Sequence, residues 1–263
     1  METSSIIDLS YLDLVVSLGL ILISAGLSWW QQIGIEADLI IGAIRAFIQL
    51  FAVGYVLKYV FAFNQWYLTI FILLIMIIIA SRTATGRQKK RTKELPYLVG
   101  FAIAAGSGIS LFLATQILLQ VKPWYQPRYL IPLAGMVIGN SMNASTLVVD
   151  RIDSEIEARR MEIEAYLAIG ATAGQAGLNC IRNAMKAAMI PSINSMMVVG
   201  IVSLPGMMTG QILSGTSPLI AVKYQILIVY MIAFSVAVSS FILAKLRFRR
   251  YFTNEHQMRE EVL

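Results

Sequence analysis

Long runs of apolar residues dominate this sequence, with shorter polar segments between them. A helix needs roughly 20 apolar residues to cross the hydrocarbon core of a bilayer. The pattern predicts seven such helices, at residues 11–30, 39–61, 66–80, 97–119, 131–149, 193–213 and 224–246. The alternation of apolar and polar residues that is typical of membrane β-barrel strands is absent from the sequence. We therefore predict an all-α, polytopic membrane protein with a single transmembrane domain over residues 1–263.

The polar segments predict how these spans are oriented. Basic residues gather after the third run, at 82–93, and after the seventh run, at 245–250. The positive-inside bias favours the cytoplasmic side for both segments. Seven spans then place the N-terminus outside, and the C-terminus and the polar segment 150–190 in the cytoplasm. No basic region or cleavage site marks the first run as a signal peptide, so we expect it to remain as an anchor.

The sixth run is interrupted by Pro205 and Gly206, and two interpretations of it stay open. A helix broken near the middle of the membrane still crosses it, whereas a re-entrant hairpin does not and leaves six spans. We prefer the crossing helix, because six spans would place one of the two basic segments outside. A break is tolerated only where protein or a water-lined cavity satisfies the freed backbone groups. Broken spans are therefore candidate transport sites, although a simple proline kink is at least as common.

Composition narrows the function classes. Hydrophobic residues make up 57% of the chain and charged residues 14%, with a net charge of +6. The basic residues lie beside the apolar runs, so we expect them to face anionic lipid rather than nucleic acid. Cys180 is the one cysteine and His256 the one histidine. This excludes a disulfide within the chain, a Cys/His zinc cage and a His-based catalytic group inside the spans, and it favours a transport subunit over an enzyme.

The segment 150–190 begins with a charged amphipathic helix and continues with residues rich in Ala and Gly. It breaks at Gly170, which predicts a short helix, a glycine turn and a second helix at the inner membrane surface. The order Glu164-Ala165-Tyr166, three residues and Gly170 resembles the EAA loop of ABC transporter permeases. In that superfamily the loop is a coupling helix that docks into a cleft on the ATPase subunit. Tyr166 departs from the pattern, because a second alanine usually stands there.

A longer resemblance extends over nearly the whole chain. Residues 44–61, 138–144, 164–176 and 182–215 together resemble the Fet-type permease family, the membrane subunits of bacterial iron exporters and plant aluminium-tolerance ABC transporters. The resemblance implies an inner-membrane exporter linked to iron or other metal homeostasis. It also implies a homodimer of permease subunits and a separate ATPase partner that carries ATP and Mg²⁺. The sequence agrees on one point: it lacks the G-x-x-x-x-G-K-[ST] phosphate loop, so we expect no cofactor in this chain.

Polar residues inside the predicted spans are the candidates for a translocation pathway. Arg45 and Gln49 lie one helical turn apart in the second span, where Arg45 either lines a pathway or extends back to the headgroups. Asn140, Ser141 and Asn143 follow a G-x-x-x-G spacing in the fifth span, where hydrogen bonds between helices are the commoner use of such residues and a pathway is the alternative. The candidates in the sixth span are Pro205, Gly206, Met207 and Met208.

These residues do not identify a substrate. The thioethers of Met207 and Met208 suit soft ions such as Cu(I), but methionine also fills membrane helices without binding anything. The spans hold no cluster of carboxylates of the kind that hard cations require. A metal chelate or an organic solute such as a nucleotide sugar fits this uncharged lining equally well. An ion-gradient-driven secondary transporter is a further alternative, but it needs inverted repeats and intramembrane acids, and Asp13 at the edge of the first span is the main candidate acid.

Overall fold

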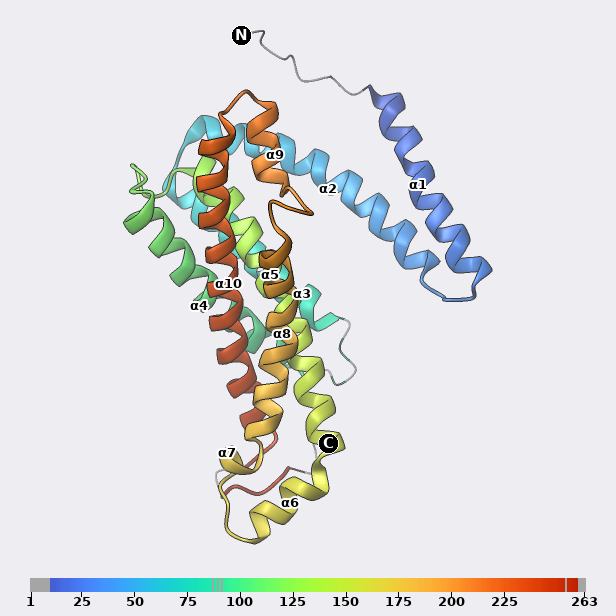
Figure 1. Cartoon of the computed structure of the whole chain (residues 1–263), viewed down its shortest axis with the longest axis vertical. Helices are drawn as coiled ribbons and strands as arrows, with labels where there is room; N and C mark the ends of the chain where they lie inside the picture. Colours follow the sequence, from blue (N-terminus) through green and yellow to red (C-terminus); the bar gives the residue numbers. More distant parts are fainter. Residues whose placement is uncertain (1–9, 87, 89, 91, 254, 260–263) are drawn as a thin grey trace. The chain divides into compact units, whose positions relative to one another are not determined.

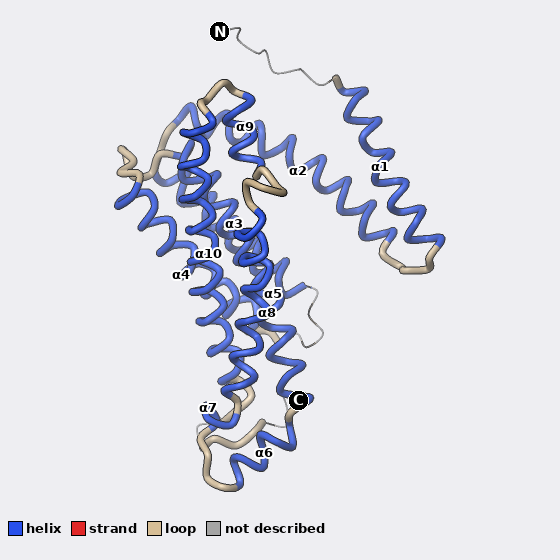
Figure 2. Tube along the Cα trace, in the orientation of Figure 1, coloured by secondary structure: helices blue, strands red, loops and turns tan. Residues whose placement is uncertain are grey.

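The computed structural model describes residues 10–86, 88, 90, 92–253 and 255–259, and it is built from helices (Figures 1 and 2). In chain order these are α1 (Tyr11–Trp30), α2 (Glu36–Phe63), α3 (Trp66–Gly86), α4 (Leu95–Phe112), the π-helix η1 (Leu113–Leu118), α5 (Pro127–Ala158), α6 (Arg160–Ala168), α7 (Ala173–Ala176), α8 (Leu178–Val198), α9 (Gly206–Leu213) and α10 (Pro218–Arg249). Over these described residues two isolated β-bridges occur and no strand. The prediction of an all-α protein is confirmed.

Among the residues that the structure describes, five helical segments are long and apolar enough to cross a membrane, which supports an integral, multi-pass membrane protein. They are Leu12–Trp30, Glu36–Phe63, Trp66–Gly86, Leu95–Leu118 and Pro218–Arg249. They correspond to the first four predicted spans and the seventh. The fifth and sixth spans are not among them, because α5 carries many polar residues and α8 ends at Val198. The count of seven, the orientation of the termini and the single permease domain stay predictions.

The chain divides into two compact units, of which the first contains residues 1–64 and 213–215. Within it, α1 and α2 form an antiparallel hairpin (Figure 1). Ser28 of α1 holds the turn, since its hydroxyl donates to Glu36 at 3.0 Å and accepts from the Ile35 N–H at 3.3 Å. Glu36 also lies in the first turn of α2, where a negative charge is favourable. Local polar contacts thus fix the reversal between two apolar helices.

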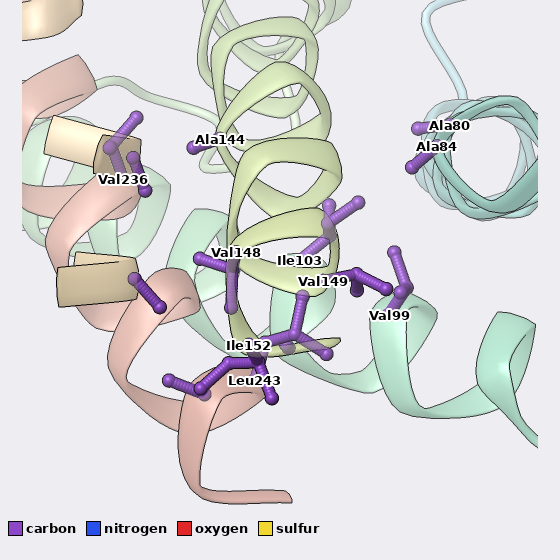
Figure 3. Packing of buried hydrophobic residues seen from close by; sticks show 14 of the residues in the cluster. Ala80, Ala84, Val99, Ile103, Ala144, Val148, Val149, Ile152, Val236 and Leu243 are labelled. Atoms are coloured by element: carbon purple, nitrogen blue, oxygen red, sulfur yellow. The ribbon is translucent and has the colours of Figure 1, made fainter. Parts of the chain in front are cut away.

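The second unit contains residues 65–212 and 216–263. α5 packs against α3, α4, α8 and α10, and these helices bury one continuous apolar cluster (Figure 3). Ile103 of α4, Val148 and Ile152 of α5 and Leu243 of α10 are buried within it. Lipid is as apolar as these side chains, so close packing rather than exclusion of water holds membrane helices together. How closely the helices pack therefore matters most for the stability of this unit.

Gly106 lies where α4 closely approaches α10. A Cβ atom at this position would lie 2.8 Å from the Ser235 carbonyl oxygen and 2.9 Å from the Ser239 nitrogen. Both of these atoms belong to the backbone of α10, so neither can rotate away. A glycine is therefore required if the two helices are to keep their separation.

Replacing Gly106 by leucine is expected to force α4 away from α10 and to destabilise the protein by about 1–3 kcal/mol, the usual cost of overpacking. Gly108 provides the control, because a Cβ there meets no atom within 4 Å. Thermal unfolding in detergent, followed by size-exclusion chromatography, compares the two variants. Equal melting temperatures for Gly106→Leu and Gly108→Leu would contradict the proposed close contact.

Candidate functional site

A pocket of about 320 Å³ lies among α5, α8, α9 and α10. Its polar lining residues come from three helices: Asn140 and Asn143 from α5, Ser192 and Ser195 from α8, and Gln225 from α10. Each pair lies three residues apart, which places its members on one face of a helix. The pocket therefore collects polar side chains on helices that are apolar over most of their length.

Residues on either side of the interruption between α8 and α9 line this pocket, among them Met196, Pro205 and Gly206. α8 ends at Val198, and Gly200 then adopts φ +83°, a conformation that glycine tolerates and other residues rarely adopt. The Gly200 N–H donates to the Ser203 carbonyl at 2.9 Å, so the turn satisfies backbone groups that the helix no longer pairs. Pro205 and Gly206 follow at the start of α9. The predicted break is confirmed, but it begins at Val199 because Gly200 ends the helix before the proline does.

The structure brings together most of the predicted pathway residues. Five of the nine line this pocket: Asn140, Asn143, Pro205, Gly206 and Met207. A second pocket, of about 230 Å³, is lined by Met208 and shares Met196, Gln225 and Val229 with the first.

Three predicted residues do not line either pocket. The Ser141 hydroxyl is buried 2.8 Å from the hydroxyl of Ser235, so it links α5 to α10 instead of facing the pocket. This is the hydrogen bond between helices that the sequence left open as an alternative. Arg45 and Gln49 belong to α2 in the first unit, and their role stays a prediction.

Sequence reasoning missed Gln225, the most deeply placed polar group of the pocket. Its side chain is only 7% exposed, and its Oε1 has no hydrogen-bond partner among the described residues. An acceptor left unpaired in this way costs roughly 1–3 kcal/mol. Gln225 is the second residue of the predicted seventh span, where a polar residue is ordinary. One signal was available in the sequence: Gln225, like Gln49, is a lone amide within a long apolar run.

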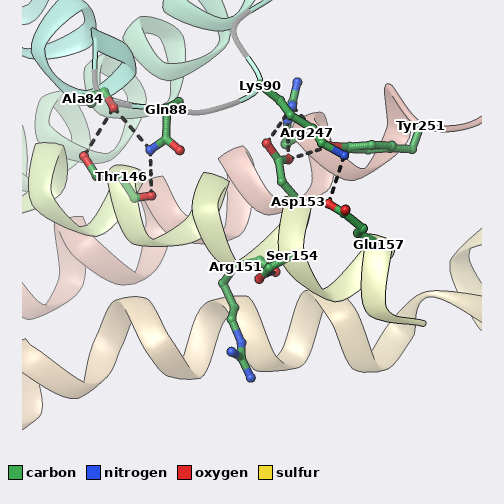
Figure 4. Close-up of polar contacts among 10 residues, drawn as sticks. All are labelled: Ala84, Gln88, Lys90, Thr146, Arg151, Asp153, Ser154, Glu157, Arg247 and Tyr251. Carbon is green, nitrogen blue, oxygen red and sulfur yellow. Dashed lines mark hydrogen bonds and ion pairs between the residues drawn. The ribbon is translucent and has the colours of Figure 1, made fainter. Parts of the chain in front are cut away.

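A buried ion pair joins α5 and α10 at the opposite end of these helices (Figure 4). Arg247 donates from Nε and Nη2 to the two carboxylate oxygens of Asp153, both at 2.8 Å. The Tyr251 hydroxyl donates to the same carboxylate at 2.7 Å. Burial, followed by the Asp153 charge, raises the pKa of Tyr251, so the phenol remains a donor. This bidentate cluster fixes how the two helices meet.

Glu155 organises a second polar cluster, which links α5 to α8. It forms ion pairs with Arg151 at 2.7 Å and Arg159 at 3.1 Å, and it accepts a hydrogen bond from Asn183 of α8 at 3.0 Å. Cys180 is buried nearby, and burial, followed by the Glu155 charge, raises the pKa of its thiol. The thiol is therefore protonated at neutral pH and has little reactivity.

The residues of the EAA-like sequence lie on an exposed element at this end. Glu164, Ala165 and Tyr166 belong to α6, and all three are exposed. Gly170 follows in the turn with φ +90°, after which a capped α7 leads into α8. The predicted helix, glycine turn and second helix are confirmed. Their role in coupling stays a prediction.

α6 carries a stripe of exposed apolar side chains. Met161 and Ala165 of α6 and its C-cap residue Ile169 recur every four residues on one face, and Met161 and Ile169 are 84% and 80% exposed. Ile163, on the opposite side of α6, is buried in the apolar cluster of the second unit and packs the helix against it. Exposed apolar side chains grouped in this way are typical of surfaces that bind another protein.

Ion pairs bring the predicted cytoplasmic segments to one end of the second unit. Lys90 pairs with Glu157 of α5 at 3.2 Å (Figure 4), and Arg250 pairs with Glu94 at 2.8 Å. This agrees with the prediction that the segment after α3, the segment 150–190 and the C-terminal tail share one side of the membrane. The basic residues Arg87, Lys89 and Arg91 lie outside the described residues.

Comparisons with known proteins extend over nearly the whole chain. Residues 11–252 match the family model described as "Uncharacterised protein family (UPF0014)". The chain is 40% identical to the UPF0014 membrane protein slr1647 of Synechocystis, over 96% of this chain and 97% of that relative. It is 35% identical to the "Probable iron export permease protein FetB" of Escherichia coli, over 94% and 93% of the two chains. It is 34% identical to "Protein ALUMINUM SENSITIVE 3" of Arabidopsis thaliana, over 94% and 89%. No solved structure matches it.

Proposed function

This chain belongs to the UPF0014 family of membrane proteins, and from that premise we propose that it is the permease subunit of an ABC exporter. The family assignment confirms the resemblance to Fet-type permeases, because relatives named for iron export and aluminium sensitivity both match. We propose that it works as a homodimer with two separate ATPase subunits in the cytoplasmic membrane. Its cargo is linked to iron or another metal.

The observation that carries this proposal is the continuity between the polar pocket and the exposed α6 stripe. α5 runs as one helix from Asn143 in the pocket to Ala158, a distance of about 22 Å at 1.5 Å per residue. α6 begins two residues later at Arg160. On the other side, α8 connects the α7 turn to Ser195 in the pocket. A displacement of α6 therefore has two direct helical routes to the pocket.

We propose the following mechanism. ATP-driven closure of the partner pushes on α6, from Glu164 to the turn at Gly170. α5 and the broken α8–α9 element, which act as the fifth and sixth crossings, then tilt. Their movement switches access to the pocket beside Asn140 and Pro205. With seven crossings the N-terminus lies outside and the pushed surface lies in the cytoplasm.

A secondary transporter has less support. Coupling to protons or sodium ions needs acidic side chains near the cargo. Among the described residues that line the pocket, none is acidic.

Copurification tests the proposed partnership. We expect an ATPase encoded beside this chain to copurify through a tag on the permease. The double variant Met161→Asp/Ile169→Asp is expected to lower its recovery about tenfold or more, because two charges enter the apolar stripe.

Ser154→Asp is the matched control, since it adds a charge at an exposed position of α5 off the stripe. Failure of the ATPase to copurify with the unaltered chain would overturn the proposed function. Equal recovery with the double variant and with Ser154→Asp would show that α6 is not the docking element.

A further inference from the structure

We propose that the pocket among α5, α8, α9 and α10 binds an uncharged cargo of small-molecule size that donates a hydrogen bond to Gln225. The proposal rests on the proposed function, because it takes this pocket as the translocation site, and it names the chemical class of the cargo.

The pocket lining is polar without being charged. Its described residues include three amides, two hydroxyls and three thioethers, and the rest are alkyl groups, proline or glycine. A bare ion or a phosphate group that entered would lose its hydration shell without meeting an opposite charge, which is costly. The lining therefore favours a cargo that carries no net charge.

Gln225 specifies what the cargo must offer. Its Oε1 is an acceptor without a partner among the described residues, on a side chain that is 7% exposed, and the side chain lines both adjoining pockets. The Asn140 amide already donates its N–H to the Met136 carbonyl at 2.8 Å, so its oxygen is a second acceptor at the pocket. Two acceptors favour a cargo with N–H or O–H groups.

The dimensions of the pocket fit a small molecule. Its volume of about 320 Å³ lies at the lower end of the roughly 300–1,000 Å³ of ligand pockets. Met136, Met196 and Met207 add flexible thioethers, which adapt to an apolar surface.

Two kinds of cargo could be uncharged and carry such hydrogen-bond donors: a metal chelate and a free organic solute. Among the described residues no group of three or more His, Cys, Asp or Glu side chains is placed to hold a metal ion. A metal is therefore expected to arrive enclosed in an uncharged chelate, whose outer surface resembles that of a free organic solute. Both sources would present N–H or O–H donors to Gln225.

Equilibrium dialysis with the purified full chain tests the proposal. One probe is radioactive tris(acetohydroxamato)iron(III), an uncharged complex with N–H donors, kept in excess ligand. Its N-methyl counterpart is equally uncharged but lacks those donors. Metal-free acetohydroxamic acid, Fe²⁺ and Ag⁺ complete the set.

We expect the N–H complex or the metal-free acid to bind. Where the complex binds, the N–H form is expected to bind at least about fivefold tighter than the N-methyl form, because it adds one hydrogen bond to a buried acceptor. Gln225→Leu is expected to remove that preference. Gln116→Leu is the matched control, because Gln116 is a partly buried amide that lines neither of the two pockets. Binding of the acid alone would identify a free organic solute as the source.

Melting temperature without ligand gives an independent readout. Gln225→Leu is expected to leave it unchanged or raised, because the variant removes an unpaired acceptor. A fall in melting temperature would instead make Gln225 a structural residue.

Three results would overturn the proposal: preferential binding of Fe²⁺ or Ag⁺, binding that Gln225→Leu leaves unchanged, or no binding of either the complex or the acid. Dialysis needs no ATPase, so these results can be distinguished from a failure of the copurification experiment, which would overturn the proposed function.

Discussion

Replacing Gly170 by valine is expected to lower ATP-dependent transport by about tenfold or more while the ATPase still copurifies. Gly170 adopts φ +90°, a conformation that costs an L-residue roughly 1–2 kcal/mol. A β-branched side chain there would reshape the turn between α6 and α7. The ATPase would then push on an element that no longer directs its movement into α8. Transport into vesicles and ATP hydrolysis, measured on one preparation, separate coupling from assembly.

Gly174→Val is the matched control for this prediction. A Cβ at either glycine meets no atom within 4 Å, but only Gly170 has a positive φ. Any difference between the two variants therefore reports the conformation of the turn and not the added volume. If both variants transport alike, the glycine turn does not carry the coupling.

Replacing Asp153 by alanine is expected to destabilise the protein by about 3–5 kcal/mol, because it leaves the Arg247 charge buried without its partner. Arg247 is fully buried, and both carboxylate oxygens of Asp153 serve it. Thermal unfolding in detergent measures the loss. Asp150→Ala is the control, since it removes an exposed carboxylate from the same helix.

The double variant Asp153→Ala/Arg247→Met distinguishes an unpaired charge from lost packing. Removing both charges is expected to cost less than removing Asp153 alone, because buried ion pairs are often replaced by apolar groups at little cost. A double variant that is less stable than Asp153→Ala would contradict this explanation.

The features that the sequence predicted correctly depend on local residue order. Runs of apolar residues predict helices, and Gly170 predicts a turn, because neither depends on distant residues. Pro205 and Gly206 indicated a broken helix, although Gly200 sets where the break begins. The Fet-type family was also identified from ordered residues along the chain.

The missed features depend on contacts between distant residues. Arg247 lies in the basic tail from which the orientation of the spans was predicted, yet it pairs with Asp153, 94 positions away. Ser141 and Asn140 are neighbours in sequence, but one faces Ser235 and the other the pocket. Which face of α5 meets α10 is decided by packing, and no periodicity within a single run contains that information.

The buried thiol of Cys180 has a practical consequence for following this protein in motion. It is the one cysteine of the chain, it is buried, and its pKa is raised. Maleimide and nitroxide reagents need an accessible thiolate. The unaltered sequence is thus already suited to site-directed labelling, and cysteines placed on α6 and beside the pocket would carry spectroscopic probes without a background signal from Cys180.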